Sequence, residues 1–147
     1  EFFGGSAEDL MRAREINPIP ILRKDFILHE YQVIESKAMG ADVLLLIAAV
    51  LDREKIKKLA ALSRSLQLEV ILEIHEPSEL KMLNENITAV GVNNRDLRTF
   101  NVNTDISIEI ADKIPEQLLK ISESGISSPI PPFTKSPCHF CAILLYY

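Results

Sequence analysis

The sequence predicts an α/β protein built as a (β/α) barrel of parallel strands, and three observations favour this fold class. Short apolar runs, typical of parallel strands covered on both faces, begin near residues 19, 43, 69, 89 and 118. Stretches of helical length separate these runs, so strand and helix alternate along the chain. No glycine-rich dinucleotide-binding motif follows a strand, and this favours a barrel over a doubly wound sheet.

Local signals set the boundaries of the expected elements. EFFGG at residues 1–5 is expected to be a loop with an aromatic tip, because its glycines allow close backbone approach. Ser6 and Asp52 are suitable N-caps, Gly40 suits a helix C-terminus, and Pro77 suits the first position of a helix. The expected elements, in order, are helix 7–15, strand 19–26, helix 29–39, strand 42–51, a helix after Asp52, strand 69–75, a helix from Pro77 to about Leu83, strand 89–92, a helix that ends at Asp112, and strand 118–121.

Polar side chains stand where several of the predicted strands end. Lys24 follows the apolar start of IPILRKDF, and Glu73 lies near the end of EVILEIH. Ligands bind at the C-terminal ends of the strands in parallel barrels, so we expect these side chains to face one cavity. A lysine and a glutamate in one cavity form a suitable general acid–base pair. The sequence therefore indicates Lys24 and Glu73 as candidate catalytic residues.

The other strand ends indicate contacts with an anionic, partly aromatic, phosphorylated substrate. An arginine with an asparagine suits a carboxylate held through a bidentate fork, and a Ser-Gly turn that enters a helix can present backbone N–H groups to phosphate. The apolar second strand and two phenylalanines can hold an aromatic body. These candidate substrate-binding residues are Asn93, Arg95, Glu123, Ser124, Gly125, Phe3, Phe26 and Leu45.

Each polar strand end also has a purely structural interpretation. Lys24 can pair with Asp25, and a neighbouring lysine can pair with the glutamate of the third strand. Asn93 and Asn94 can simply shape a turn. His75 is interpreted as a loop residue rather than a metal ligand, since no second ligand stands at a suitable spacing from it. The coincidence of several polar strand ends weakens the structural interpretation for the set as a whole.

Composition excludes several classes of function. The 147 residues are 47% hydrophobic and 25% charged, close to an average soluble domain. A net charge of −5 argues against a nucleic-acid partner, which normally requires a basic face. No apolar run approaches the ~20 residues of a membrane-spanning helix, and no signal peptide is expected from the first residues. We expect a cytoplasmic protein with no membrane partner.

The sequence changes character from Pro129 onward. The last residues hold half of the prolines, both cysteines and a single charged residue, and no helical or strand period continues through them. Cys138 and Cys141 flank a histidine but lack the second pair of ligands of a structural zinc site, so no metal site is expected. We therefore divide the chain into a barrel domain, 1–128, and a proline-rich tail, 129–147, that is expected to be disordered.

Six motifs, FFGGS, PILRKDF, GADVLLLIAAVL, LEIHEPSEL, GVNNRDLRTF and ESGIS, follow one another over residues 1 to about 129. In this order they closely resemble the indole-3-glycerol phosphate synthase family. The resemblance implies a TIM barrel and a cytoplasmic carbon–carbon lyase (carboxy-lyase) of tryptophan biosynthesis that needs no cofactor. The implied reaction closes a ring, with decarboxylation and dehydration, and converts 1-(2-carboxyphenylamino)-1-deoxyribulose 5-phosphate to indole-3-glycerol phosphate.

The resemblance also implies a role for each candidate residue by its position. Lys24 resembles the family's general acid, and Glu73 resembles its second proton-transfer group. Asn93 and Arg95 resemble polar contacts to the substrate. The implied turn near the ribulose and phosphate is Glu123, Ser124 and Gly125, and the implied walls around the aromatic ring are Phe3, Phe26 and Leu45.

The match covers only strands three to seven of the family's barrel. The family's first two strands are not matched in this chain, and the first of them carries a further glutamate and lysine of the site. The eighth strand, whose end carries a glycine-rich phosphate turn, is not matched either. We therefore expect a partial barrel that is inactive by itself and self-associates through open sheet edges. Two alternatives stay open: a different phosphate-binding barrel such as phosphoribosylanthranilate isomerase, which RKDF and GVNNRDL disfavour, and a non-catalytic truncated fragment or decayed phosphate-ligand binding module.

Overall fold

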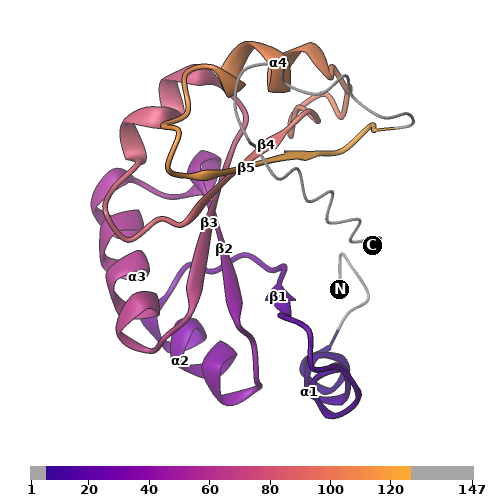
Figure 1. Cartoon of the computed structure of the whole chain (residues 1–147), viewed down its shortest axis with the longest axis vertical. Coiled ribbons are helices and arrows are strands. Elements are labelled where there is room, and N and C mark those ends of the chain that lie inside the picture. The colour runs from indigo at the N-terminus through magenta and orange to yellow at the C-terminus, as the bar shows by residue number, and fades with distance from the viewer. Residues whose placement is uncertain (1–5, 127–147) are drawn as a thin grey trace.

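In the computed structural model, which describes residues 6–126, five parallel strands form one sheet in the order β1-β2-β3-β4-β5. Strands that follow one another in the sequence are neighbours in the sheet, as expected for βα units. Helices α2, α3 and α4 lie along the same side of the sheet, and α1 lies at its β1 end (Figure 1). The elements are α1 (Ala7–Ile16), β1 (Leu22–Arg23), α2 (Glu30–Ala38), β2 (Val43–Ile47), the 3₁₀ turn η1 (Ala48–Val50), α3 (Arg53–Ser65), β3 (Glu69–Ile74), the 3₁₀ helix η2 (Pro77–Met82), β4 (Ala89–Asn93), α4 (Asp105–Ala111) and β5 (Leu119–Glu123).

The pleat of the strands divides their side chains between two faces of the sheet. Successive residues of a strand point to opposite faces, so every second side chain belongs to the same layer. One layer packs against the helices and forms the main core, with Leu44, Leu46, Val70, Leu72 and Val90 from the strands and Val33, Ile56, Leu59 and Ile110 from the helices. The opposite layer, called the inner face below, contains the cluster Leu45, Ile47, Ile71, Ala89 and Ile121.

The first strand is much shorter than the sequence predicts. A strand is expected over residues 19–26, but only Leu22–Arg23 pair with β2. Pro20 has no N–H to donate to a neighbouring strand, and Ile19 is 62% exposed. After the strand the chain bends at Asp25, whose carboxylate accepts the N–H of Phe26 at 2.8 Å.

Two further boundaries differ from the prediction. The strand expected over residues 42–51 ends at Ile47, and the next three residues form η1. The helix expected from Pro77 is the short 3₁₀ helix η2, which ends where the N–H of Leu83 donates to the carbonyl of Leu80 at 3.1 Å. The other elements agree with the prediction to within a few residues at each end.

Arg14 joins α1 to the turn that precedes β2. Its guanidinium donates to the Gly40 carbonyl at 3.0 Å and forms an ion pair with Asp42. The same Asp42 carboxylate accepts the N–H of Ile21 at 2.7 Å. Gly40 has a φ of +91°, and a Cβ there would lie 2.8 Å from Arg14 Cγ, so this position requires glycine.

Within residues 6–126, no helix is long and apolar enough to cross a membrane. The predicted tail 129–147, with Cys138 and Cys141, lies outside the described residues, and the prediction of its disorder therefore stays a prediction.

The main core generates a direct test of the fold. Leu59 on α3 is fully buried in that core, so Leu59→Ala should lower the free energy of unfolding by about 2–5 kcal/mol through lost burial and a residual cavity. Lys58→Ala, one residue away on the exposed side of the same helix, should change it by no more than about 0.5 kcal/mol. Urea unfolding curves measure both values, and equal effects of the two substitutions would contradict this packing.

Candidate active site

Three charged side chains from alternate strands meet on the inner face. Lys24 stands directly after β1, Glu73 lies on β3, and Glu123 is the last residue of β5. Lys24 Nζ donates to Glu73 Oε2 and to Glu123 Oε2, at 2.9 Å in each case. The Glu73 side chain is only 3% exposed. The sheet is therefore curved enough that one lysine on its first strand contacts both the third and the fifth.

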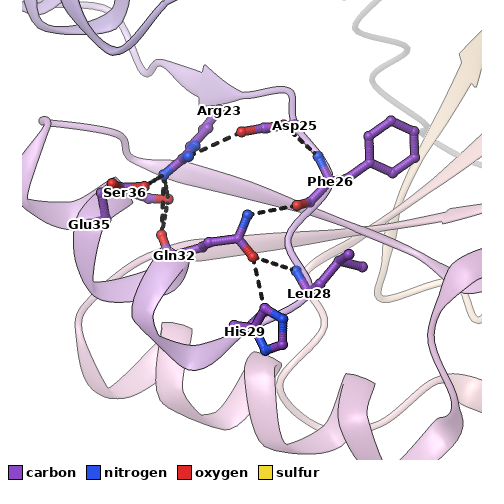
Figure 2. A network of polar contacts seen from close by, with 8 residues as sticks. All are labelled: Arg23, Asp25, Phe26, Leu28, His29, Gln32, Glu35 and Ser36. Atoms are coloured by element: carbon purple, nitrogen blue, oxygen red, sulfur yellow. Dashed lines mark hydrogen bonds and ion pairs between the residues drawn. The ribbon is translucent and has the colours of Figure 1, made fainter. Parts of the chain in front are cut away.

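The residues that flank Lys24 fix the end of β1 on the opposite side of the sheet (Figure 2). Arg23 points toward α2, where its guanidinium donates to Glu35 Oε2 at 2.8 Å and Ser36 Oγ at 3.0 Å. Arg23 also pairs with Asp25 at 3.0 Å. Asp25 is therefore the partner of Arg23, and the structural alternative in which Lys24 pairs with Asp25 is wrong. Because the neighbour of Lys24 is anchored outward, strand alternation turns Lys24 inward.

Gln32 of α2 holds the loop that follows β1. Its Nε2 donates to the Phe26 carbonyl at 2.8 Å, and its Oε1 accepts the N–H groups of Leu28 at 2.8 Å and His29 at 3.0 Å. Figure 2 shows the Phe26 ring directed away from Gln32 and these hydrogen bonds. One side chain thus satisfies three backbone groups of the loop, and Phe26 remains 39% exposed.

Asn93 extends the charged cluster to the ends of β4 and β5. Its Nδ2 donates to Glu73 Oε1 at 3.1 Å, so both oxygens of the Glu73 carboxylate are engaged. Its Oδ1 accepts from Ser124 Oγ at 2.8 Å and from the backbone N–H of Arg95 at 3.0 Å. The structure therefore brings together five of the predicted site residues, namely Lys24, Glu73, Asn93, Glu123 and Ser124.

The turn after β5 has an unusual backbone conformation. Ser124 and Gly125 have φ values of +68° and +69°, and the left-handed region is costly for a non-glycine residue. A Cβ on Gly125 would lie 2.1 Å from Val102 Cγ1, so glycine is required there for space as well as for conformation. Two successive left-handed residues at the edge of the polar cluster indicate a turn whose shape is imposed by its surroundings.

Asn94 imposes part of that shape, and sequence reasoning missed its role. The interpretation of Asn94 as a simple turn former is wrong, because its side chain is completely buried. Its Nδ2 donates to Ser122 Oγ at 3.0 Å and to the Ser124 carbonyl at 3.1 Å, while its Oδ1 accepts from Ser107 Oγ at 2.8 Å. Asn94 thereby ties α4, β5 and the Ser124 turn together. The only sequence signal for this role was the pair of asparagines at the end of β4. Residue type alone did not show which of the two faces Glu73 and which is buried beneath the Ser124 turn.

Burial and charge act against each other in this cluster. Burial lowers the pKa of the Lys24 ammonium, but the charges of Glu73 and Glu123 and their hydrogen bonds outweigh it and raise the pKa above 10.5. Burial raises the pKa of the Glu123 carboxyl above 4.5, and the negative charge of Glu73 raises it further, while Lys24 offsets only part of the effect. The cluster therefore holds a firmly protonated lysine beside a carboxyl group that gains a proton more readily than usual.

His75 lies beside this cluster, immediately after β3. Its Nε2 is 3.4 Å from Glu73 Oε1. Both ring nitrogens are buried, and neither has a hydrogen-bond partner among the described residues. Since buried polar atoms are normally paired, His75 leaves unused hydrogen-bonding capacity next to Glu73.

The remaining predicted site residues lie farther from the charges or outside the described part of the chain. The Arg95 side chain is exposed, and its Nη1 donates to the Phe100 carbonyl at 3.2 Å. Leu45 is 1% exposed and belongs to the apolar cluster of the inner face. Phe3 falls within residues 1–5, which are not described.

The raised pKa of Glu123 predicts a specific pH dependence of stability. Between pH 4.5 and the higher folded-state pKa, the folded chain binds more protons at Glu123 than the unfolded chain does, so this contribution to stability falls as pH rises. Glu123→Gln removes that titration. The difference in unfolding free energy between the parent and this variant should therefore favour the parent more at pH 4.5 than at about pH 7.5. Urea unfolding at both pH values measures it, and a difference that does not vary with pH would contradict the prediction.

Solved structures support the fold. A chain from the tryptophan synthase α2β2 complex of Pyrococcus furiosus matches with a TM-score of 0.62 and 15% sequence identity, over 84% of this chain and 56% of that one. A native KDPGal structure matches with a TM-score of 0.54 and 10% identity, over 79% of this chain and 50% of that one. The five parallel strands and their helices are thus part of a TIM-barrel fold.

Proteins found by sequence comparison share a much higher sequence identity with this chain than these solved structures do. An indole-3-glycerol phosphate synthase from Bacteroides thetaiotaomicron is 47% identical over 129 residues, which is 88% of this chain and 50% of that protein. The enzyme of the same name from Polaromonas naphthalenivorans is 45% identical, over 88% of this chain and 49% of that protein. That from Chlorobium phaeobacteroides is 41% identical, over 98% of this chain and 56% of that protein. This chain therefore spans about half the length of these relatives.

The family model for indole-3-glycerol phosphate synthase matches residues 1–131. This match includes all five strands, β1 to β5, and therefore every residue of the charged cluster. The chain belongs to the indole-3-glycerol phosphate synthase family, whose members are carboxy-lyases of tryptophan biosynthesis.

Proposed function

We propose that this chain forms the central part of an active indole-3-glycerol phosphate synthase, with residues 1–128 as its barrel portion. The observation that carries the proposal is the Lys24 ammonium, which contacts two carboxylates on the inner face at the C-terminal ends of the strands. The reaction closes a ring on 1-(2-carboxyphenylamino)-1-deoxyribulose 5-phosphate and releases one carbon dioxide and one water. The product is indole-3-glycerol phosphate, and the residues below need no cofactor for these steps.

Lys24 has the properties of the general acid. The aromatic carbon that carries the carboxylate attacks the ketone carbon of the ribulose part, and negative charge develops on the ketone oxygen. A lysine whose pKa is raised above 10.5 stays protonated near neutral pH and can donate a proton to that oxygen. Loss of carbon dioxide then restores the aromatic ring, and the protonated oxygen can leave as water.

Glu73 is the proposed second proton-transfer group. The dehydration removes a hydroxyl group and a proton from adjacent atoms, so it needs a base as well as an acid. Glu73 Oε2 contacts Lys24 Nζ and Glu73 Oε1 contacts Asn93 Nδ2, and these contacts hold the carboxylate at a fixed position. General acid–base catalysis requires an acid and a base at fixed positions, here Lys24 and Glu73.

The surrounding residues are proposed to bind the substrate. The turn formed by Glu123, Ser124 and Gly125 is proposed to lie near the ribulose and phosphate. In that turn, the Glu123 carboxylate suits ribulose hydroxyl groups and the Ser124–Gly125 backbone suits the phosphate, while Asn93 and Arg95 suit other polar groups of the substrate. Phe26, which is partly exposed, is proposed to supply apolar surface for the aromatic ring. For buried Leu45 and for Phe3, which lies outside the described residues, a place in the same apolar wall is proposed from the family resemblance. A phosphorylated substrate does not cross a membrane unaided, which supports a cytoplasmic setting.

The role of Lys24 is tested in a completed barrel. In this protein, a family member supplies the barrel strands that are not matched in this sequence. Lys24→Ala in this protein should reduce kcat by about 10²–10⁴-fold, because the positioned acid is removed. Lys57→Ala, on the exposed side of α3, is the matched control and should leave turnover unchanged. Indole-3-glycerol phosphate formation is followed by its absorbance, and near-normal turnover in Lys24→Ala would assign the acid to another group.

A polypeptide of these 147 residues alone is proposed to self-associate and to lack synthase activity. Among the described residues, β1 and β5 each pair with a single neighbour, so both present unpaired backbone groups. The further acid and base and the glycine-rich phosphate turn of the family are not matched in this sequence. Light scattering and a turnover assay on the purified polypeptide test both statements. A monomer that forms indole-3-glycerol phosphate would contradict them.

A further inference from the structure

The carboxylate of Glu123 crosses β4 to reach Lys24. Gly91 lies on β4 opposite Glu73 on one side and Ile121 on the other. On β5, Glu123 is two residues beyond Ile121 and therefore on the same face. Glu123 Oε2 contacts Lys24 Nζ at 2.9 Å, so its side chain leans back over the sheet toward β1.

Gly91 supplies the space that this path needs. A Cβ on Gly91 would lie 2.3 Å from Glu123 Oε1, far closer than real Cβ contacts allow. The same Cβ would lie 3.4 Å from Glu123 Cδ and 3.4 Å from Ile71 Cγ2, which are near-ordinary contacts. The obstruction is thus confined to one oxygen of one carboxylate.

We propose that Gly91 is a positioning residue for the reaction: by having no side chain, it lets Glu123 lie across β4 and contact Lys24. This inference rests on the proposed function of Lys24 as the acid. Any larger residue at position 91 moves the Glu123 carboxylate away from the inner face, and Lys24 then keeps only Glu73 as its anionic partner.

The backbone itself does not require glycine at position 91. Its φ lies outside the left-handed region that excludes other residues, in contrast to Gly40 and Gly125. The atom that obstructs a methyl group is the far end of a flexible side chain, which can rotate away. Gly91→Ala should therefore still fold to the same structure, and an unchanged circular dichroism spectrum would separate loss of position from loss of structure.

Two measurements on the completed barrel test the proposal. Gly91→Ala should lower kcat by about 10²-fold, the scale of effect expected when a site group is displaced by about 1 Å. It should also lower the pKa of Lys24, because Glu123 is one of the two carboxylates that raise it. A side-chain NMR titration of Lys24 measures that change without any assay of activity.

A double-mutant cycle identifies the route of the effect. If Gly91 acts through Glu123, Gly91→Ala should have little further effect in a Glu123→Ala background, where the added methyl group meets no carboxylate. Equal losses of kcat in both backgrounds would overturn the proposal, as would an unchanged Lys24 pKa in Gly91→Ala. A completed barrel with no turnover would reject the proposed function and, with it, a role for Gly91 in the reaction. A lowered Lys24 pKa in Gly91→Ala would then still support the geometric part, in which Gly91 lets Glu123 contact Lys24.

Discussion

The two-residue alternation of five parallel strands decides which side chains can take part in chemistry. Because the strands are in register, the inner face carries Ile47, Glu73, Gly91 and Ile121 as neighbours across the sheet. A shift of one residue in any strand would bury that strand's polar end against the helices and turn its core residue inward. The main core of the helical face therefore fixes the register, and the register fixes the site.

Electrostatics gives the site its asymmetry. One ammonium group shares the inner face with two carboxylates, so the three groups together carry a net negative charge when all are ionised. Glu73 is the more deeply buried carboxylate and receives hydrogen bonds at both oxygens, whereas Glu123 receives one from Lys24 and has a raised pKa. Groups of one chemical type are thus placed in different environments, which is how proteins separate acid and base functions.

Sequence reasoning recovered the order of the elements and most of the charged cluster, because strand ends follow directly from apolar runs. It failed where tertiary contacts decide. The strand expected over residues 19–26 shrinks to Leu22–Arg23, because Pro20 has no N–H to donate to β2 and the chain bends at Asp25. Asn94 could not be distinguished from Asn93 by residue type, yet one faces Glu73 and the other is buried beneath the Ser124 turn. Gly91 gave no signal, since its importance depends on a side chain from another strand.

The glycines show that the site is shaped as much by missing side chains as by those present. Gly125 is required by its own backbone conformation and by Val102, so its replacement would strain the fold. At Gly91 the backbone is ordinary and the short contact of an added Cβ is with the Glu123 carboxylate, so under our proposal this glycine is constrained by the reaction rather than by folding. Buried Asn94 holds the Ser124 turn from below, while Asn93 holds it from the inner face. The polar end of β5 is therefore positioned from both sides of the sheet, and under the proposed function the substrate would meet a turn whose geometry is set before it binds.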